Sequence, residues 1–400
     1  MKILFLTDNF PPEVNAPATR TFEHCREWVK VGAEVTVITC FPNFPGGKIY
    51  PSYRNKLFQK EVIEGIKVIR VWTYISANKG IIRRSLDYLS FGIVSFFVSL
   101  FSSFDIIIAT SPQFFTAVSA GTVSLLRNKK FIFEVRDLWP ESIVGVDVMK
   151  ENFFIRFLSW IEKLLYRRAW KIVVVSEGFI PTIIKMKISR DKIYCISNGI
   201  NTKNFYPREK DKTLLLKFNL DGKFVVGYMG THGMAHKLDF IIDCIREIRD
   251  ESIHFLFIGE GAKKETLKKQ AVELKLNNIT FINNVSRDEV SSYLSLLDAG
   301  LIHLRISEAF EKVIPSKIFE LAAMQIPMLL GVRGEASRFL MKYNAGVCFE
   351  PENKNDFIAK LLELKNNSRL REEVKAGEAM LAKDFDRATL ARKMFELFST

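Results

Sequence analysis

Cysteine and histidine are scarce in this sequence, and their positions exclude several kinds of site. The 400 residues include 5 Cys, none in a C-x-x-C pair, and 5 His, none in an H-E-x-x-H or mixed Cys/His pattern. We therefore expect neither a disulfide framework nor a metal site, and reduced thiols are typical of a cytoplasmic protein. A G-x-S-x-G nucleophile motif is also missing. No cofactor requirement is predicted.

Long hydrophobic runs are lacking as well. The apolar stretch at the start of the chain ends at Asp8, before two prolines, and is too short for a secretion signal. The uncharged apolar run at residues 88–104 includes five serines and is at the lower length limit of a membrane span. Three interpretations remain open for it: a membrane-spanning helix, a helix buried in the core, and a helix lying partly in a membrane interface.

Positive charge, in contrast, is plentiful and unevenly distributed. The formal net charge is +13; residues 1–200 hold 27 Lys and Arg against 17 Asp and Glu, and residues 201–400 hold 31 against 28. A basic first half favours an anionic partner. The aromatic and basic segment 153–171 has the composition of a membrane-surface helix, although a core-facing helix with a basic exposed side also fits. No nucleic-acid-binding motif accompanies the charge, so nucleic acid is not expected as a partner.

Strand and helix patterns alternate along the chain. Short apolar runs followed by helical spacing occur from residue 2 to about 175, and the pattern restarts at about 223. This alternation predicts parallel sheets, and the length suffices for two domains. We expect an α/β protein with two doubly wound, Rossmann-like domains, at 1–198 and 199–384, and a ligand in the interdomain cleft beyond the strand carboxyl ends. The tail, 385–400, contains an amphipathic helix.

Glycines follow two predicted strands of the second half. Gly230 and Gly233 lie between a strand and a helix, where backbone N–H groups can approach a phosphate. A tight turn without a ligand would use the same residues. His236 follows at the helix start, where a cation could face a diphosphate. Gly259 and Gly261 close the next strand and could admit a nucleobase or a sugar.

A lysine and a glutamate share the first turn of another predicted helix. Ser316 precedes this turn and could cap the helix, and Lys317 and Glu320 are three residues apart on one face. A lysine is disfavoured near a helix N-terminus, so a bound anion is one reason for its presence. A neighbouring carboxylate can accept two vicinal hydroxyls of a ribose. An ordinary surface pair is the alternative.

Polar residues also follow a predicted strand of the first half. The run 136–142 contains Arg136, Asp137 and Glu141 around a rigid Trp-Pro pair, which suits a hydroxyl-rich ligand. Asp137 could alternatively serve only as a local capping group. The opening loop, with Glu13 and Arg20, is expected at the same edge of the sheet.

Together these motifs resemble the family-4 retaining glycosyltransferases of the GT-B fold. The resemblance rests on LFLTDNFPPEVNAPATR, RDLWPES, ISNGINTKNF, GYMGTHG, IGEG, PSKIFELAAMQIP and NAGVCFEPEN, which occur in the family's order over nearly the whole chain. The opening loop with FPNFPGG and RDLWPES is similar to the bacterial branch that builds O-antigen and capsule repeat units, often described as N-acetyl-L-fucosamine transferases.

The resemblance implies metal-independent sugar transfer with retention, from a UDP-linked donor to an undecaprenyl-diphosphate-linked sugar. It implies a donor site in the second domain, an acceptor site in the first, and a last helix that returns to the first domain. It also implies a cytoplasmic enzyme held peripherally at the inner face of the cytoplasmic membrane, with anionic lipid as a partner of the first domain.

By position, the resemblance assigns roles to individual residues. Glu320 would hold the donor ribose, and Lys317 or His236 the diphosphate, near Ser316. The remaining assigned residues are Gly230, Gly233, Gly259, Gly261, Asn284 and Val285 on the donor side, Glu13, Arg20, Arg136 and Glu141 on the acceptor side, and Asp137 and Arg305 in catalysis. The chain departs from the family where the E-x7-E pair would need Glu at 312, since it has Lys312, and where His236 replaces a lysine.

A retaining transfer without an enzymic nucleophile can proceed on one face of the sugar. The leaving diphosphate then accepts the proton of the acceptor hydroxyl, and the enzyme supplies positioning and positive charge. We expect Lys317, aided by Arg305 or the 230–233 loop, to supply that charge. The alternatives are a nucleotide-sugar 2-epimerase of the same fold and a non-catalytic, membrane-associated binder of sugar nucleotides.

Overall fold

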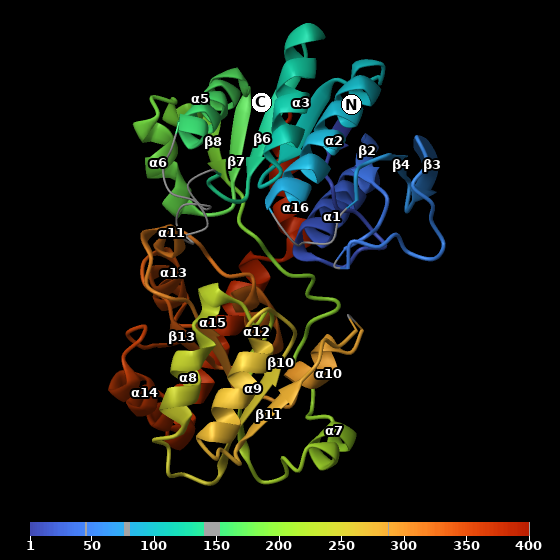
Figure 1. The fold of residues 1–400 in the computed structure, drawn as a ribbon. Coiled ribbons are helices and arrows are strands. Elements are labelled where there is room, and N and C mark those ends of the chain that lie inside the picture. The colour runs from blue at the N-terminus through green and yellow to red at the C-terminus, as the bar shows by residue number, and fades with distance from the viewer. Residues whose placement is uncertain (45, 76–80, 140–152, 287, 400) are drawn as a thin grey trace. The chain divides into compact units, whose positions relative to one another are not determined.

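The computed structural model describes residues 1–44, 46–75, 81–139, 153–286 and 288–399. These residues form two compact units (Figure 1). Unit 1 comprises Met1–Ser197 and Arg387–Thr400, and unit 2 comprises Asn198–Asp386. Each unit is built around a sheet of mainly parallel strands with helices packed on it, which confirms the predicted α/β fold class.

An eight-stranded sheet forms the centre of unit 1, in the order β3-β4-β2-β1-β5-β6-β7-β8. Its strands are β1 (Lys2–Leu6), β2 (Glu34–Cys40), β3 (Phe58–Ile63), β4 (Ile66–Val71), β5 (Ile106–Thr110), β6 (Lys130–Val135), β7 (Lys171–Val174) and β8 (Ile193–Cys195). The central strands β1, β5 and β6 are almost wholly buried. Helices on both faces account for their continuous apolar runs.

Helices cover this sheet. They are α1 (Ala16–Lys30), α2 (Ile81–Leu100), α3 (Phe114–Leu126), α5 (Phe153–Arg168), α6 (Ile180–Lys185) and α16 (Arg387–Glu396), with 3₁₀ turns at Glu177–Phe179 and Arg190–Lys192. α3 packs against both α2 and α5.

β3 and β4 form an antiparallel pair that the sequence pattern does not predict. Its two-residue turn is formed by Glu64 and Gly65, whose φ angles of 47° and 82° are both left-handed. Such a turn matches the twist of the adjoining strands and favours glycine. β3 alternates between exposed and half-buried side chains, as an edge strand does, so no continuous apolar run marks it in the sequence.

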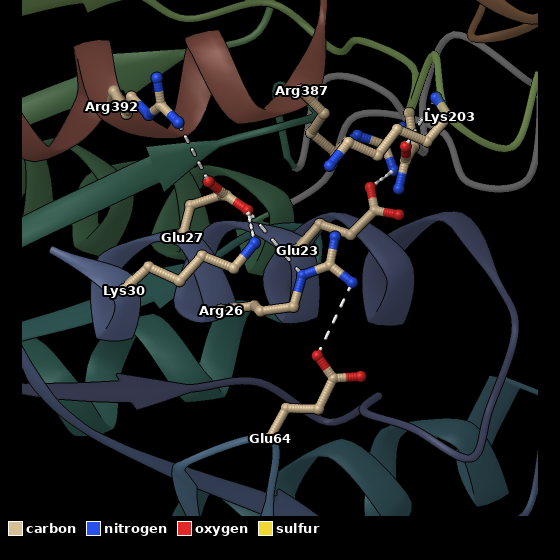
Figure 2. A network of polar contacts seen from close by, with 9 residues as sticks. Glu23, Arg26, Glu27, Lys30, Glu64, Lys203, Arg387 and Arg392 are labelled. Atoms are coloured by element: carbon tan, nitrogen blue, oxygen red, sulfur yellow. Dashed lines mark hydrogen bonds and ion pairs between the residues drawn. The ribbon is translucent and has the colours of Figure 1, made fainter.

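The last helix, α16, packs along α1 within unit 1. The Trp28 Nε1 atom donates to the Ala391 carbonyl oxygen at 2.8 Å, and the Trp28 ring lies 5.1 Å from the Phe398 ring between centroids. Figure 2 shows ion pairs beside this contact, from Glu23 to Arg387 and from Glu27 to Lys30 and Arg392. The contact thus combines a buried aromatic core with a charged border.

A six-stranded parallel sheet forms the centre of unit 2, in the order β11-β10-β9-β12-β13-β14. Its strands are β9 (Phe224–Met229), β10 (Ile253–Ile258), β11 (Ile279–Ile282), β12 (Ala299–His303), β13 (Met328–Gly331) and β14 (Gly346–Cys348). Successive residues contribute to two separate apolar clusters, for example Val225 to one and Val226 to the other. Both faces of the sheet are therefore covered.

The helices of unit 2 flank these strands. They are α7 (Lys212–Lys217), α8 (Leu238–Ile245), α9 (Lys264–Glu273), α10 (Val290–Leu294), α11 (Glu308–Glu311), α12 (Lys317–Met324), α13 (Glu335–Tyr343), α14 (Lys354–Asn366) and α15 (Ser368–Asp384), with a 3₁₀ turn at Met234–His236. The carboxyl ends of β9 to β12 are adjacent, because these strands are neighbours in the sheet.

Two helices of unit 1 expose apolar faces. On α2 and just after it, exposed apolar side chains recur three or four residues apart, at Leu86, Leu89, Ile93, Phe97 and Phe101. On α5 they recur in the same way, at Phe153, Phe157, Trp160 and Leu164. Phe101 and Phe153 are 83% and 86% exposed, whereas Phe91 is 1% exposed. α2 is therefore buried on one side only.

In the described part of the chain, every helix falls short of the length or the hydrophobicity that a bilayer-spanning segment requires.

Candidate active site

Lys317, the first residue of α12, lies against the end of β9. Its Nζ atom is 5.2 Å from the centroid of the Tyr228 ring, and a Cβ on Gly230 would lie only 2.5 Å from Lys317 Cε. Burial lowers the pKa of the Lys317 ammonium, and the Glu320 carboxylate opposes that shift. Within the residues that the structure describes, no ion pair joins Lys317 to a carboxylate. This ammonium is therefore suited to bind an anion.

Glu320 lies one turn after Lys317 on α12. The two side chains line a narrow cavity whose other walls are Gly227, Met229, Leu294, Leu297, Leu301 and Leu321. Ser316 is the N-cap residue of α12, but its side chain makes no capping hydrogen bond. The expected capping role is thus wrong, because the Ser316 backbone is helical rather than extended. Its exposed side chain stays a candidate for contact with a ligand.

His236 packs against the same tyrosine, with 5.5 Å between the ring centroids of Tyr228 and His236. Its Nδ1 is 3.3 Å from the His303 carbonyl oxygen, and the His303 Nδ1 is 2.9 Å from the His236 carbonyl oxygen. A carbonyl only accepts, so each Nδ1 carries the proton and each Nε2 is an acceptor. Burial, followed by the charge of Lys317, lowers the pKa of His236 to about 3. His236 is therefore neutral near pH 7 and is not the cation expected from the sequence.

The two glycine turns of unit 2 are held together by their backbones. A Cβ on Gly259 would lie 2.0 Å from the Gly230 carbonyl oxygen, and one on Gly261 would lie 2.4 Å from that of His232. The His232 N–H donates to the Glu260 carbonyl at 2.9 Å. Gly259 and Gly261 are thus required for the close packing of the β9 and β10 loops.

The remaining predicted donor-side residues surround these turns. Gly233 precedes the 3₁₀ turn that carries His236. Arg305 follows β12 and is half-buried, and its N–H donates to the Ala235 carbonyl at 2.9 Å. Beyond β11, Asn284 is exposed and Val285 packs partly on the core. All of them lie in loops at the carboxyl edge of the unit 2 sheet.

In unit 1, Arg136 and Asp137 follow β6 and are held by Ser111. Both N–H groups donate to the Ser111 Oγ, at 2.9 and 3.2 Å, and this hydroxyl donates to the Asp137 carbonyl at 3.0 Å. Burial raises the pKa of Asp137 to about 6 and lowers that of Arg136 to about 10. Within the described residues the Arg136 Nε and Nη1 atoms are buried without a hydrogen-bond partner. An acid–base group near neutral pH thus adjoins a cation with unused donors.

Glu13 and Arg20 are occupied inside unit 1. The Glu13 Oε1 accepts from the Asn43 and Phe44 N–H groups at 2.8 Å. Arg20 is 2% exposed; it pairs with Glu134 at 2.9 Å and also donates to the Ile196 and Ser197 carbonyls. These contacts fix the loop after β2 and the chain after β8, which leaves neither side chain reaching outward to a ligand. Glu141 lies outside the described residues.

Two buried charged residues of these regions were not predicted. Asp8 follows β1, accepts from the Thr116 Oγ1 at 3.3 Å, and has its pKa raised by burial and then by Asp87. Lys264 is the first residue of α9 and is 2% exposed. Two sequence features could have indicated them: Asp8 is a carboxylate directly after the first apolar strand, and Lys264 follows a glycine turn closely.

Within the described residues, no group of three His, Cys, Asp or Glu side chains is arranged to hold a metal ion.

Comparison with known proteins identifies the family. Residues 18–204 match Glycosyltransferase Family 4, and residues 214–378 match Glycosyl transferases group 1. The chain belongs to these glycosyltransferases. A protein named for colanic acid biosynthesis, the glycosyl transferase WcaI of Escherichia coli (strain K12), is 24% identical over 390 residues, which cover 93% of this chain and 95% of WcaI. The teichuronic acid biosynthesis glycosyltransferase TuaH of Bacillus subtilis (strain 168) is 24% identical over 59% of this chain and 58% of its own.

Solved structures share the fold. Sucrose-phosphate synthase from Thermosynechococcus elongatus aligns with a TM-score of 0.78 at 15% identity, over 100% of this chain and 98% of that one. Anabaena HepE, in complex with UDP and glucose, aligns with a TM-score of 0.73 at 13% identity, over 100% and 99% of the two chains. The glycosyltransferase therefore has the GT-B fold.

Proposed function

We propose that this glycosyltransferase moves a sugar from a UDP-linked donor to a lipid-diphosphate-linked sugar, with retention and without a metal ion. The product is a repeat unit of a bacterial O-antigen or capsule, and the proposed sugar is N-acetyl-L-fucosamine or another N-acetylated deoxyhexosamine. The relatives named for colanic acid and teichuronic acid biosynthesis support a polysaccharide product, and the UDP complex of HepE supports a UDP donor. The observation that carries the proposal is the partly buried ammonium of Lys317, which lies against Tyr228 and Gly230 and whose pKa is lowered by desolvation.

The donor is proposed to bind at the carboxyl edge of the unit 2 sheet. Lys317 faces the diphosphate, with Ser316, Arg305 and the 230–233 loop supplying further hydrogen bonds. Glu320 accepts the two ribose hydroxyls. The loops at Gly259–Gly261 and 284–285 contact the base. The neutral His236 offers an acceptor nitrogen, which suits a hydroxyl of the donor rather than a phosphate.

The transfer is proposed to occur on one face of the sugar. The bond from the anomeric carbon to the diphosphate oxygen breaks while the acceptor oxygen approaches the same face, and its proton passes to the leaving diphosphate. Lys317 stabilises the negative charge that develops on that leaving group. In unit 1, Arg136 and Asp137 are proposed to bind and orient the acceptor, Arg136 through its unused N–H groups.

Unit 1 is proposed to rest on an anionic membrane from which it takes the acceptor. The apolar side chains exposed on α2 and α5 support this proposal, because they sit on helices that also expose arginine, at Arg83, Arg156 and Arg167. Apolar insertion combined with basic residues is how monotopic helices bind anionic lipid.

A donor panel tests the proposed function. Purified protein is incubated with UDP-, GDP- and dTDP-sugars, with and without undecaprenyl-diphosphate-linked N-acetylhexosamine, and the products are identified by mass spectrometry. We expect a lipid-linked disaccharide and free UDP only when the acceptor is present. Conversion of the donor sugar without an acceptor would indicate an epimerase instead, and binding without nucleotide release would indicate a non-catalytic binder.

A further inference from the structure

Lys264 is a buried lysine whose three N–H groups are all used. Its side chain is 3% exposed, and its Nζ lies 2.7 Å from the Glu260 Oε1, 2.6 Å from the Asn283 Oδ1 and 3.2 Å from the Ile282 carbonyl oxygen. A lysine ammonium has three donors, so this geometry saturates it. Burying a charge is costly even when it is paired, and an apolar side chain would serve packing alone. The three polar contacts of the Lys264 ammonium therefore point to a role other than packing.

The three partners lie at the carboxyl ends of two neighbouring strands, β10 and β11. Glu260 belongs to the turn after β10. Ile282 is the last residue of β11, which is the edge strand on its side of the sheet, and Asn283 follows it. The Ile282 carbonyl also accepts from the Gly259 N–H at 3.1 Å. Beyond this point the chain leaves β11, and the Lys264 bond to the Asn283 Oδ1 continues the connection. Lys264 thus fixes where residues 283–285 begin.

This loop, residues 283–285, is the one proposed to contact the nucleobase of the donor. Asn283 and Asn284 are exposed, with amide groups able to both donate and accept, which is what reading a base edge requires. The turn at 259–261 is in turn tied to the β9 loop through the His232–Glu260 and Lys263–His232 backbone bonds, at 2.9 and 3.0 Å. The buried ammonium of Lys264 therefore helps to set the distance between two loops: residues 283–285, proposed to contact the nucleobase, and residues 230–233, proposed to contact the diphosphate.

We propose that Lys264 is a positioning residue that sets the nucleobase selectivity of the donor site by holding the 283–285 loop to the 259–261 turn. This inference rests on the proposed nucleotide-sugar function. Lys264 touches neither base nor phosphate; it acts through Asn283 and Glu260. Its loss should therefore weaken the discrimination between bases while leaving the diphosphate contacts of Lys317 intact.

The test compares Lys264→Met with Lys268→Met, a lysine of the same helix that pairs on the surface with Glu265. Binding of UDP, ADP, GDP and dTDP is measured by calorimetry, and inorganic pyrophosphate is used as a competitor that reports the diphosphate contacts alone. We expect Lys264→Met to reduce the preference for the best nucleotide over the others by about tenfold or more, with unchanged competition by pyrophosphate. Lys268→Met should match the wild type.

A second variant, Asn283→Ala, keeps the test valid if Lys264→Met does not fold, because Asn283 is exposed. It should lower base selectivity in the same direction, and the double variant should show no further loss than Lys264→Met, since Lys264→Met already removes the contact that positions Asn283. Equal losses for nucleotides and pyrophosphate, or unchanged selectivity in either folded variant, would overturn the inference while the function stands. A wild-type protein that binds none of the four nucleotides would instead refute the proposed function.

Discussion

Replacement of Lys317 by methionine should uncouple stability from activity. Methionine matches the length of the lysine side chain and keeps its contact with Tyr228 while removing the charge. Because burial lowers the pKa of Lys317, the folded protein bears a desolvation cost for keeping this ammonium charged at neutral pH. Lys317→Met should therefore unfold at a higher temperature than the wild type.

Lys317→Met should also strongly reduce the rate of sugar transfer. Losing one preorganised charge that faces a developing negative charge costs about 10²–10³-fold in kcat, equal to about 3–4 kcal/mol. The wild type should also lose donor affinity on the alkaline side, at a pH below the ordinary lysine value of 10.5, because its ammonium deprotonates there. Lys317→Met should lack this alkaline limb.

The assay is nucleotide release at varied donor concentration and pH, with thermal unfolding followed by circular dichroism. Lys342→Met, which changes an exposed lysine of α13, is the matched control and should leave both properties unchanged. A Lys317→Met protein with near-normal kcat and donor affinity would refute the assignment of Lys317 to the diphosphate. A lower unfolding temperature would refute the argument that the Lys317 ammonium bears a net desolvation cost.

Three further changes test other parts of the molecule. Asp137→Asn should raise the free energy of unfolding at pH 7.5 by about 2–3 kcal/mol and leave it nearly unchanged at pH 4, as measured by urea titration at each pH. The reason is that the pKa of Asp137 in the folded protein, about 6, exceeds the ordinary 3.8, so the wild type loses stability as the pH rises between these values. Equal effects at both pH values would contradict this. The pair Phe101→Ser and Phe153→Ser should reduce sedimentation with phosphatidylglycerol vesicles about tenfold or more, whereas Leu216→Ser, at an exposed leucine of unit 2, should not; equal binding by all three proteins would argue against the membrane surface. Trp28→Ala should destabilise unit 1 by about 3–5 kcal/mol, seen as a lower urea midpoint, since it removes the contact that docks α16; an unchanged midpoint would show that α16 adds little to stability.

The sequence predicted the buried parallel strands well, because strands covered on both faces are continuous apolar runs between polar loops. The β3–β4 pair escaped prediction because an edge strand with a polar face carries no such run. Membership in the glycosyltransferases followed from the order of several motifs, which is information that no single glycine or lysine contains.

Prediction of the site from sequence was limited by burial, which the sequence does not specify. Arg20 and Arg136 both flank predicted ligand loops, yet the guanidinium of Arg20 is paired with Glu134 while two nitrogens of Arg136 have no partner among the described residues. His236 occupies a position where a cation was expected, and only the reciprocal contact with His303 and the surrounding burial show that it is neutral. Such differences depend on residues that are distant in sequence.

Lys264 and Lys317 illustrate why charge must be judged with its partners. Each is the first residue of a helix in unit 2; Lys264 is buried and Lys317 is half-buried. The ammonium of Lys264 has three oxygen acceptors, including a carboxylate, so it is electrically and geometrically complete without a ligand. The ammonium of Lys317 lies against an aromatic ring and a glycine, and desolvation lowers its pKa despite the nearby Glu320 carboxylate, so the proposed anion would stabilise it. The first lysine can therefore shape a binding site, whereas the second can take part in binding itself.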